Sequence, residues 1–193
     1  MRTALVTGAA GFIGFHTCRA LLGAGWQIAM ADDEPASRQA FVQAGVAEDA
    51  QALVVGLTQP WSWQRDFAAG RASGYWEASF GRWSSELDDG QRSSAWVTQL
   101  GVTPVLRWQP RTWGERGFVE AGIGANLLLP IYRSRDKRFS TAFNFGNHIA
   151  IGWRLGAQRR HEIALRVQHF SNAGIRHPNP GEDFVQLRWA WRA

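Results

Sequence analysis

From about residue 40 onward, apolar and polar side chains alternate with a period of two along most of the chain. The pattern recurs in eight segments, at residues 41–47, 51–63, 74–83, 94–109, 117–128, 141–155, 161–171 and 184–192. A period of two is typical of β-strands that turn one face to an apolar environment. We therefore predict an all-β fold of eight antiparallel strands without an intervening helix.

The chemistry of the two strand faces indicates which all-β architecture to expect. In residues 161–171, Ile163 and Val167 share one face, while Glu162 and Arg166 share the other. A soluble sandwich hides its apolar face between sheets and uses shorter strands, whereas a transmembrane barrel turns that face to lipid. Strand length and the polar inner face favour an eight-stranded transmembrane β-barrel of the outer-membrane type.

Composition agrees with this prediction without requiring it. The chain has 193 residues with 11 Trp and 2 Tyr, and a single cysteine excludes an internal disulfide. Its formal net charge of +5 suits nucleic acid, anionic lipid or lipopolysaccharide equally well. Pro60 and Pro104 fall inside predicted strands, where proline indicates a bulge or a shorter strand.

The first 33 residues follow a different pattern. A short apolar strand leads into a glycine-rich turn, a helix is predicted at 12–23, and a second strand at 27–31 ends in acids. Glycines at a strand-to-helix turn, with an acid about 20 residues later, form the dinucleotide-binding fingerprint. Its residues here are Gly8, Gly11, Gly14, Asp32 and Asp33.

This segment resembles the start of nucleotide-sugar epimerases and dehydratases of the extended short-chain dehydrogenase family. No further βα units follow, and a Tyr-x-x-x-Lys pair is absent. An export signal is the alternative, with Arg2 and Arg19, an apolar stretch at 20–29 and a small-x-small pattern at 29–31. We expect residues 1–33 to be an epimerase-like or signal-like leader, through a fusion or a misassigned start, and not a functional domain.

The candidate catalytic residues lie at the end of segment 161–171. His169 and Ser171 continue its apolar face, so in a barrel they would face lipid. Residues i and i+2 of a strand share a face with Cβ atoms roughly 6–7 Å apart, so the two side chains can meet. Serine becomes a nucleophile when a base takes its proton, and the base works best when a carboxylate orients it. The alternative is that the spacing of His169 and Ser171 is incidental and has no catalytic role.

The following loop offers the other groups that such a site needs. Glu182 and Asp183 return beside the strand, and either could orient His169. The alternation of the last strand, extended back toward its start, puts Asp183 on the lipid face. Glu182 would reach that face only through a bulge or a turn. For the stabilisation of an oxyanion the candidates are Asn172, the Gly174 amide and Asn179.

The run His-Phe-Ser-Asn-Ala-Gly-Ile at 169–175 and Pro-Asn-Pro-Gly-Glu at 178–182 resemble the signature of the lipid A 3-O-deacylase (PagL) family of Gram-negative outer membranes. Residues 74–78 and 118–124 resemble internal strands of that family, and the likeness spans roughly 38–193. It implies an eight-stranded barrel that hydrolyses the ester at the 3-position of lipid A, without metal or cofactor, through a Ser-His-Glu triad.

Carried onto this chain, the resemblance makes Ser171 the nucleophile, His169 the base and Glu182 the acid, with Asn172 supporting the site and Asp183 as the alternative acid. It implies a bacterial outer-membrane location and lipid A or lipopolysaccharide as the partner, with no nucleic acid; a homodimer is compatible with it. The rival hypotheses are a non-catalytic outer-membrane barrel and a dinucleotide-binding oxidoreductase fragment.

Strand order predicts which connections face outward. With the N-terminus in the periplasm, the connections at 130–140 and 172–183 lie on the exterior, where phosphorylated lipid A is found. The first carries four cations, Arg133, Arg135, Lys137 and Arg138. A solvated turn is the alternative interpretation of that basic loop.

Overall fold

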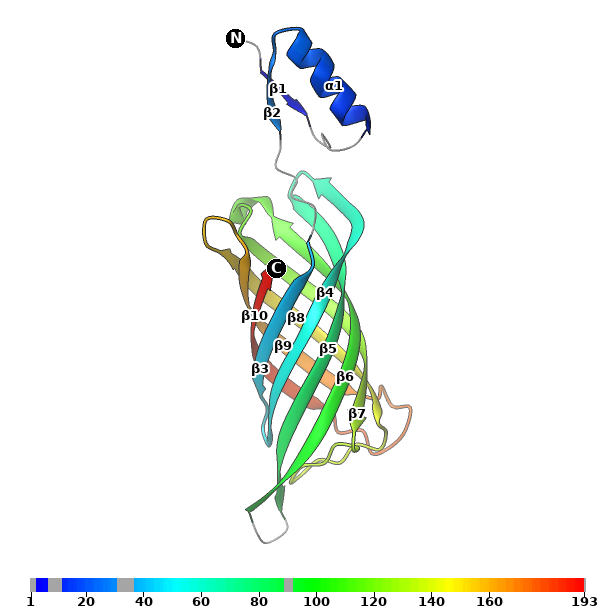
Figure 1. Cartoon of the computed structure of the whole chain (residues 1–193). Helices are drawn as coiled ribbons and strands as arrows, with labels where there is room; N and C mark the ends of the chain where they lie inside the picture. The colour runs from blue at the N-terminus through cyan, green and yellow to red at the C-terminus, as the bar shows by residue number, and fades with distance from the viewer. Residues whose placement is uncertain (1–2, 7–11, 31–36, 89–91, 193) are drawn as a thin grey trace. The chain divides into compact units, whose positions relative to one another are not determined.

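The computed structural model describes residues 3–6, 12–30, 37–88 and 92–192 (Figure 1). The chain divides into two compact units, residues 1–36 and 37–193. In the first unit, β1 (Thr3–Val6) pairs in parallel with β2 (Gln27–Met30), and α1 (Phe12–Gly23) connects them. No helix among the described residues is both long and apolar enough to cross a membrane.

This βαβ order agrees with the elements predicted for the N-terminal segment. Gly14 lies within α1. The remaining fingerprint residues lie outside the described residues, namely Gly8, Gly11, Asp32 and Asp33.

The second unit is a closed barrel in which every strand pairs with its neighbours in antiparallel fashion. The strand order is β10-β3-β4-β5-β6-β7-β8-β9, so the last strand closes onto the first. This confirms the predicted eight-stranded barrel. The strands are β3 (Gln39–Val46), β4 (Ala50–Phe67), β5 (Gly70–Asp88), β6 (Arg92–Pro110), β7 (Gly117–Leu129), β8 (Phe143–Leu155), β9 (His161–Ser171) and β10 (Glu182–Arg192), and a short 3-10 helix, η1 (Arg111–Trp113), follows β6.

Three strands are longer than their alternation predicts. β5 and β6 contain 19 residues each and β4 contains 18. Backbone pairing continues past the alternating part of each sequence, because ladder hydrogen bonds do not depend on side-chain polarity. The register between β4 and β5 shifts between Pro60 and Gln64, as the proline indicated. Pro104 instead lies within β6, opposite Trp76.

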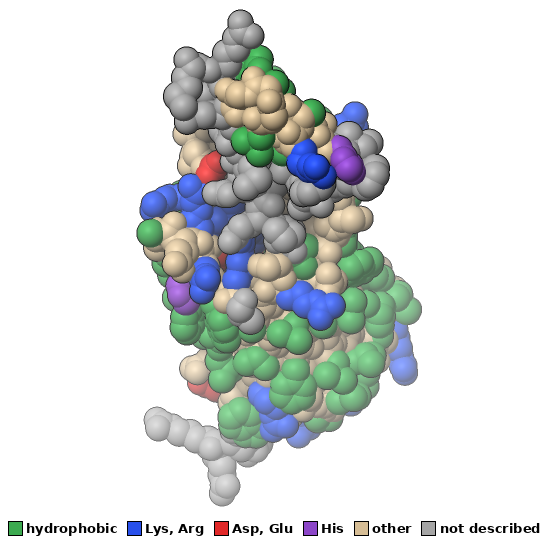
Figure 2. All heavy atoms as spheres, turned by 45° about the horizontal axis from the view of Figure 1, so that its top comes forward, with side chains coloured by type: hydrophobic (Ala, Val, Ile, Leu, Met, Phe, Trp, Pro, Cys, Tyr) green, Lys and Arg blue, Asp and Glu red, His purple; other side chains and the backbone are tan. Residues whose placement is uncertain are grey.

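The outer wall of the barrel is apolar. Side chains of β9 alternate between exposed and buried along the strand, and its outward residues include Ile163, Leu165 and Val167. Figure 2 shows hydrophobic side chains covering the visible wall. Tryptophans gather near the end at which β8 ends and β9 begins, and two of them, Trp113 and Trp153, stack with ring centroids 5.7 Å apart. This is the pattern of a lipid-facing band with an aromatic girdle.

Charged side chains occupy the interior of the barrel, where they pair with one another. The guanidinium of Arg166 donates two hydrogen bonds of 3.1 Å to the carboxylate of Glu77, and Arg188 donates a third of 2.6 Å. All three side chains are at most 5 % exposed. Because buried charges are tolerated only when they are paired, this cluster holds three strands, β5, β9 and β10, together across the lumen.

A second interior cluster is centred on Arg107. Its guanidinium donates to Glu120 at 2.6 Å and to both carboxylate oxygens of Glu162, at 2.9 and 2.7 Å. Arg154 also donates to Glu162, and Tyr75 donates to Glu120. Side chains therefore fill this part of the lumen, as is usual for an eight-stranded barrel.

We expect Glu77→Gln to destabilise the barrel strongly, because two buried guanidinium groups lose their counter-charge. The free energy of unfolding should fall by about 3 kcal/mol or more, measured by urea titration of the protein in lipid vesicles with tryptophan fluorescence. The control is Asp66→Asn, which removes the exposed pair with Arg71 and should change stability by less than about 1 kcal/mol. Equal effects of the two substitutions would contradict the assigned role of the cluster.

Candidate functional site

A histidine and a carboxylate meet on the outer wall of the barrel. His169 and Asp183 are direct partners across the β9–β10 ladder, so their side chains project from the same face of the sheet. The Nδ1 atom of His169 lies 2.7 Å from Oδ1 of Asp183. An Nδ1–H that donates to the carboxylate leaves Nε2 of the imidazole available as a base.

Glu182, the acid implied by the family resemblance, lies on the other side of the same wall. It is opposite Phe170, faces the interior and is 1 % exposed. Its carboxylate accepts a hydrogen bond of 2.6 Å from the Tyr132 hydroxyl and one of 2.9 Å from Lys137 Nζ. β10 begins at Glu182 in unbroken register with β9, so the wall separates this carboxylate from the imidazole.

The loop partners of Glu182 are held in the ionisation states that this contact needs. Burial, together with the hydrogen bond to Glu182, raises the pKa of Tyr132, which keeps the phenol neutral as a donor. Burial of Lys137 opposes its charge, but the hydrogen bonds and charges of Glu182 and Glu48 together outweigh burial and raise the pKa of the ammonium. Glu182 therefore fixes the 130–142 connection to the start of β10.

Aromatic side chains on the inner face anchor the strands that carry the site. Phe170 lies between His169 and Ser171 in sequence, and Phe184 follows Asp183; both point inward and are at most 1 % exposed. Their rings pack against Trp83, with centroids 4.8 and 4.7 Å away. Alternation thus gives every outward polar group of the site a buried aromatic neighbour, which limits how far the group can move.

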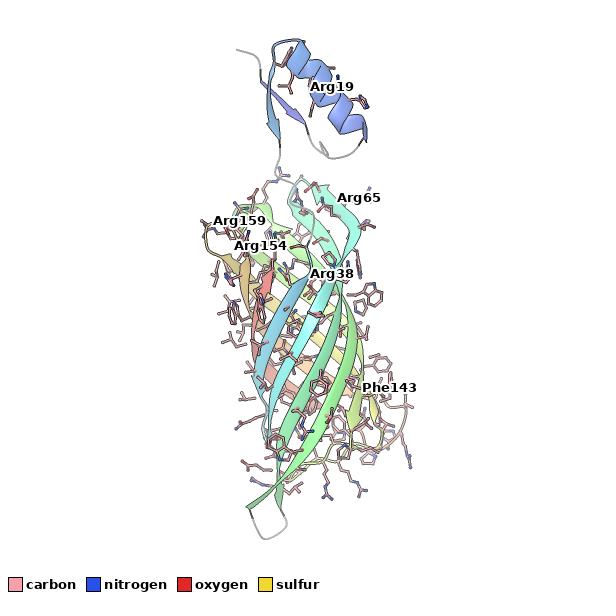
Figure 3. All side chains as sticks on the ribbon, viewed as in Figure 1. Arg19, Arg38, Arg65, Phe143, Arg154 and Arg159 are labelled. Atoms are coloured by element: carbon pink, nitrogen blue, oxygen red, sulfur yellow. The ribbon has the colours of Figure 1, made fainter. Side chains whose placement is uncertain are left out.

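Ser171 ends β9 on the same outward face as His169, in agreement with the predicted parity. It is opposite Phe145 of β8, and the Phe145 ring packs edge-on against Phe143 at 5.1 Å. Figure 3 shows Phe143 at one end of the barrel and Arg38, Arg65, Arg154 and Arg159 at the other. The serine and histidine therefore lie beside apolar side chains near one rim of the wall.

Asn172 organises the loop that follows Ser171. Its side-chain amide donates to Ser140 Oγ at 3.0 Å and to the Arg176 carbonyl at 2.7 Å, and its Oδ1 accepts from the Gly174 amide at 2.9 Å. Its backbone N–H donates to Oδ1 of Asn179 at 3.0 Å. Two of the three predicted oxyanion candidates, Asn172 and the Gly174 amide, thus already donate their N–H groups to partners in the loops.

Asn179 differs from these two residues. Its Oδ1 accepts the bond from Asn172, and this contact fixes the orientation of the side-chain amide. Because an amide has one oxygen and one NH₂ group, the Nδ2 donors must point away from Asn172. Of the three candidates, Asn179 best combines a fixed position with spare donors.

Gly181 is a residue whose role the sequence did not predict. Its φ is +72°, and a Cβ atom there would lie 2.6 Å from Cε1 of His169. Both observations require glycine, because side chains other than hydrogen are strained at positive φ and would collide with the imidazole. The Pro-Gly pair before Glu182 was the available signal, but it indicated only a turn. Within the described part of the chain, no cluster of His, Cys, Asp or Glu could hold a metal ion.

Comparisons with known proteins identify a family model and relatives that match this chain. A family model described as "Lipid A 3-O-deacylase (PagL)" matches residues 51–192. A protein called "Lipid A deacylase PagL" from Bordetella bronchiseptica is 36% identical over 167 residues, which cover 85% of this chain and 88% of the relative. A protein of the same description from Pseudomonas aeruginosa is 28% identical over 155 residues, covering 78% and 85% respectively.

A solved structure with the description "Crystal structure of the outer membrane enzyme PagL" has the same fold. Its TM-score is 0.67 at 24% identity, and the match covers 80% of this chain and 99% of that chain. A second family model, "NAD dependent epimerase/dehydratase family", matches residues 4–69. The part of that match from Gln39 onward lies on β3 and β4 of the barrel, so a βαβ arrangement accompanies only its beginning.

We expect Gly181→Ala to displace the His169 imidazole and break its hydrogen bond to Asp183. Proton–nitrogen NMR of the labelled imidazole would report the loss as a changed Nδ1 shift. Gly156→Ala is the matched control, since Gly156 has a φ of +80° but no neighbour within 4 Å of an added Cβ. An unchanged His169 signal in Gly181→Ala would show that the contact does not position the ring.

Proposed function

The chain belongs to the lipid A 3-O-deacylase (PagL) family, and from this membership we propose that Ser171, His169 and Asp183 act together as its esterase site. The protein is an ester hydrolase of the bacterial outer membrane that removes an acyl chain from lipid A. The observation that carries the proposed site is the 2.7 Å contact between His169 and Asp183 on the outward face that also holds Ser171.

Each residue has a defined role in the proposed reaction. His169 takes the proton of the Ser171 hydroxyl as Oγ attacks the carbonyl carbon of the 3-O-linked ester. When the tetrahedral intermediate collapses, the ester C–O bond breaks, and His169 returns the proton to the 3-hydroxyl oxygen of lipid A. Water then attacks the acyl–serine with His169 again as the base, which releases the fatty acid and restores Ser171.

We assign the orienting carboxylate to Asp183 in place of Glu182. A triad acid must hydrogen-bond the imidazole nitrogen that does not face the nucleophile. Asp183 Oδ1 contacts Nδ1 of His169, whereas both oxygens of Glu182 are bound on the inner face by Tyr132 and Lys137. The shorter carboxylate suffices because the two residues are direct partners in the ladder. This assignment keeps a triad of serine, histidine and acid, with Asp183 as the acid where the family resemblance implies Glu182.

Asn179 is the proposed donor to the oxyanion. Its Nδ2 group is directed by the bond that its Oδ1 accepts from the Asn172 amide. A donor that is positioned before the reaction stabilises the developing charge without reorganisation. Asn172 and Gly174 then support the site indirectly, because they shape the loop that carries Asn179.

The apolar wall next to the serine suits an acyl chain. Phe145 is opposite Ser171, and Val167 and Ile149 follow on the same outward surface, exposed to 46% and 66% respectively. An acyl chain in the outer leaflet can therefore lie along the barrel while its ester reaches Ser171. The groups of the site all lie between His169 and Asp183, so we propose that residues 1–33 take no part in the reaction.

Three substitutions test the assignment of the triad. We expect Ser171→Ala to abolish lipid A deacylation and Asp183→Asn to lower kcat by about 10³–10⁴-fold. Glu182→Gln should lower kcat by less than about tenfold, because it leaves His169 oriented. Mass spectrometry of lipid A treated with each purified, folded variant measures these rates. A severe loss in Glu182→Gln with a mild one in Asp183→Asn would return the acid role to Glu182.

Asn179→Asp tests the oxyanion donor. The substitution keeps an oxygen that can accept from the Asn172 amide, but removes the NH₂ group and places negative charge beside the oxyanion. We expect kcat to fall by about 10²–10³-fold or more with little change in KM. A rise in KM with unchanged kcat would instead make Asn179 a substrate-binding residue.

A further inference from the structure

The 130–142 connection contains a short hairpin, residues 132–139, at the rim that carries the proposed site. The backbone N–H of Phe139 donates to the Tyr132 carbonyl at 3.0 Å, and that of Ser134 donates to the Lys137 carbonyl at 2.7 Å. Tyr132 and Phe139 are buried on one face of the hairpin, with ring centroids 5.0 Å apart. The hairpin is therefore fixed to the barrel by one face, and its other face points away from the aromatic cluster.

Two of the four cations in this hairpin have structural partners. Arg135 donates to Glu86 at 2.7 Å and lies 4.0 Å from Asp49. Lys137 contacts Glu182 at 2.9 Å and Glu48 at 3.6 Å. These pairs connect the hairpin to the β3–β4 turn, to β5 and to β10, so their charges are compensated within the protein.

The other two cations, Arg133 and Arg138, are paired with each other. They form an isolated antiparallel bridge, and the two hydrogen bonds that flank it make them a non-hydrogen-bonded pair. In such a pair the Cα atoms lie about 4.5 Å apart and the side chains share one face. Both residues are exposed. Among the residues that the structure describes, no carboxylate lies within ion-pair distance of either guanidinium.

Like charges directly opposite each other destabilise a hairpin. An anion bound from outside the protein would offset the repulsion between Arg133 and Arg138. Two adjacent guanidinium groups match the geometry of a phosphate, which accepts paired hydrogen bonds from each of them. The hairpin is also connected to the proposed catalytic loop, because Ser140 Oγ accepts from Asn172 Nδ2 and donates to the Arg176 carbonyl.

We propose that Arg133 and Arg138 form a binding site for a phosphate of the lipopolysaccharide headgroup, which positions the ester of lipid A at Ser171. This inference rests on the proposed function, since the hairpin and the reacting loop would hold two parts of one substrate. Arg135 and Lys137 have no direct part in binding. Lys137 helps to hold the hairpin in place through its contact with the buried Glu182, whereas the exposed Arg135–Glu86 pair contributes little to that. The phosphate belongs either to the lipid A disaccharide or to the inner-core sugars.

The test measures KM and kcat of the full chain in detergent micelles with bisphosphorylated lipid A and with the same lipid A after removal of its phosphates. For the double variant Arg133→Gln/Arg138→Gln, we expect KM on the phosphorylated substrate to rise by about tenfold or more with little change in kcat. KM on the dephosphorylated substrate should stay at the wild-type value. The matched control is Arg135→Gln, which removes a compensated cation from the same hairpin and should leave the preference for phosphate unchanged.

A KM that is unaffected by the double substitution, or that rises equally on both substrates, would overturn the proposal for lipid A. If the effect appears only on lipopolysaccharide that retains its inner core, the phosphate is on the core sugars. Equilibrium binding of both lipids to Ser171→Ala, with and without the two Gln substitutions, tests the phosphate site independently of turnover. Phosphate-dependent binding without hydrolysis by the wild-type protein would disprove the esterase but keep the anion site.

Discussion

Closure of the sheet into a barrel leaves no free edge and gives each strand one face toward the lumen and one toward the outside. Once β10 pairs with β3, every residue of a strand has only two directions available, the lumen or the outer wall. A single step along the chain exchanges one environment for the other. Glu182 and Asp183 are adjacent carboxylates, yet one holds a loop from inside the barrel and the other contacts an imidazole outside it.

The same constraint explains how an exposed site can be held firmly. Outward groups on a barrel wall have few neighbours, but the residues between them point into a packed interior. Phe170 and Phe184 pack against Trp83 there, and the Glu182 contact ties the neighbouring loop to the start of β10. Interior ion pairs around Glu77 and Arg107 hold the strands further along the lumen. The rigidity of the proposed site thus comes from the inner side of the wall, opposite the face that carries His169, Ser171 and Asp183.

Period-two alternation was sufficient to predict the barrel and the outward direction of His169 and Ser171, because both follow from the polarity of whole strands. The choice between the two acids was harder. Strand parity pointed to Asp183, while the family resemblance pointed to Glu182, and the structure places Asp183 against the imidazole because β10 continues through both residues without a bulge. The inward–outward alternation of β10 therefore already holds at Glu182 and Asp183, although the Pro-Gly pair before them indicated a turn.

Features of the loops could not be predicted in this way. The bonds around Asn172 depend on a backbone that adopts positive φ at Ala173 and Gly174, and no periodic signal reports such a conformation. The division of the basic hairpin into compensated and uncompensated cations likewise depends on acids contributed by distant strands, such as Glu86 and Glu182. The charges of that segment can be read from its residues, but only the fold determines which of them are already neutralised.

In the proposed mechanism, the location of Ser171 on the outer wall also determines how enzyme and substrate meet. A soluble substrate reaches a buried pocket by diffusion in three dimensions. A lipid reaches a group on the lipid-facing surface by lateral diffusion in two dimensions, within one leaflet. In that mechanism, the rate depends on the surface density of lipid A around the barrel. Turnover would then respond to the crowding and fluidity of the membrane, and would not change on dilution of the surrounding medium.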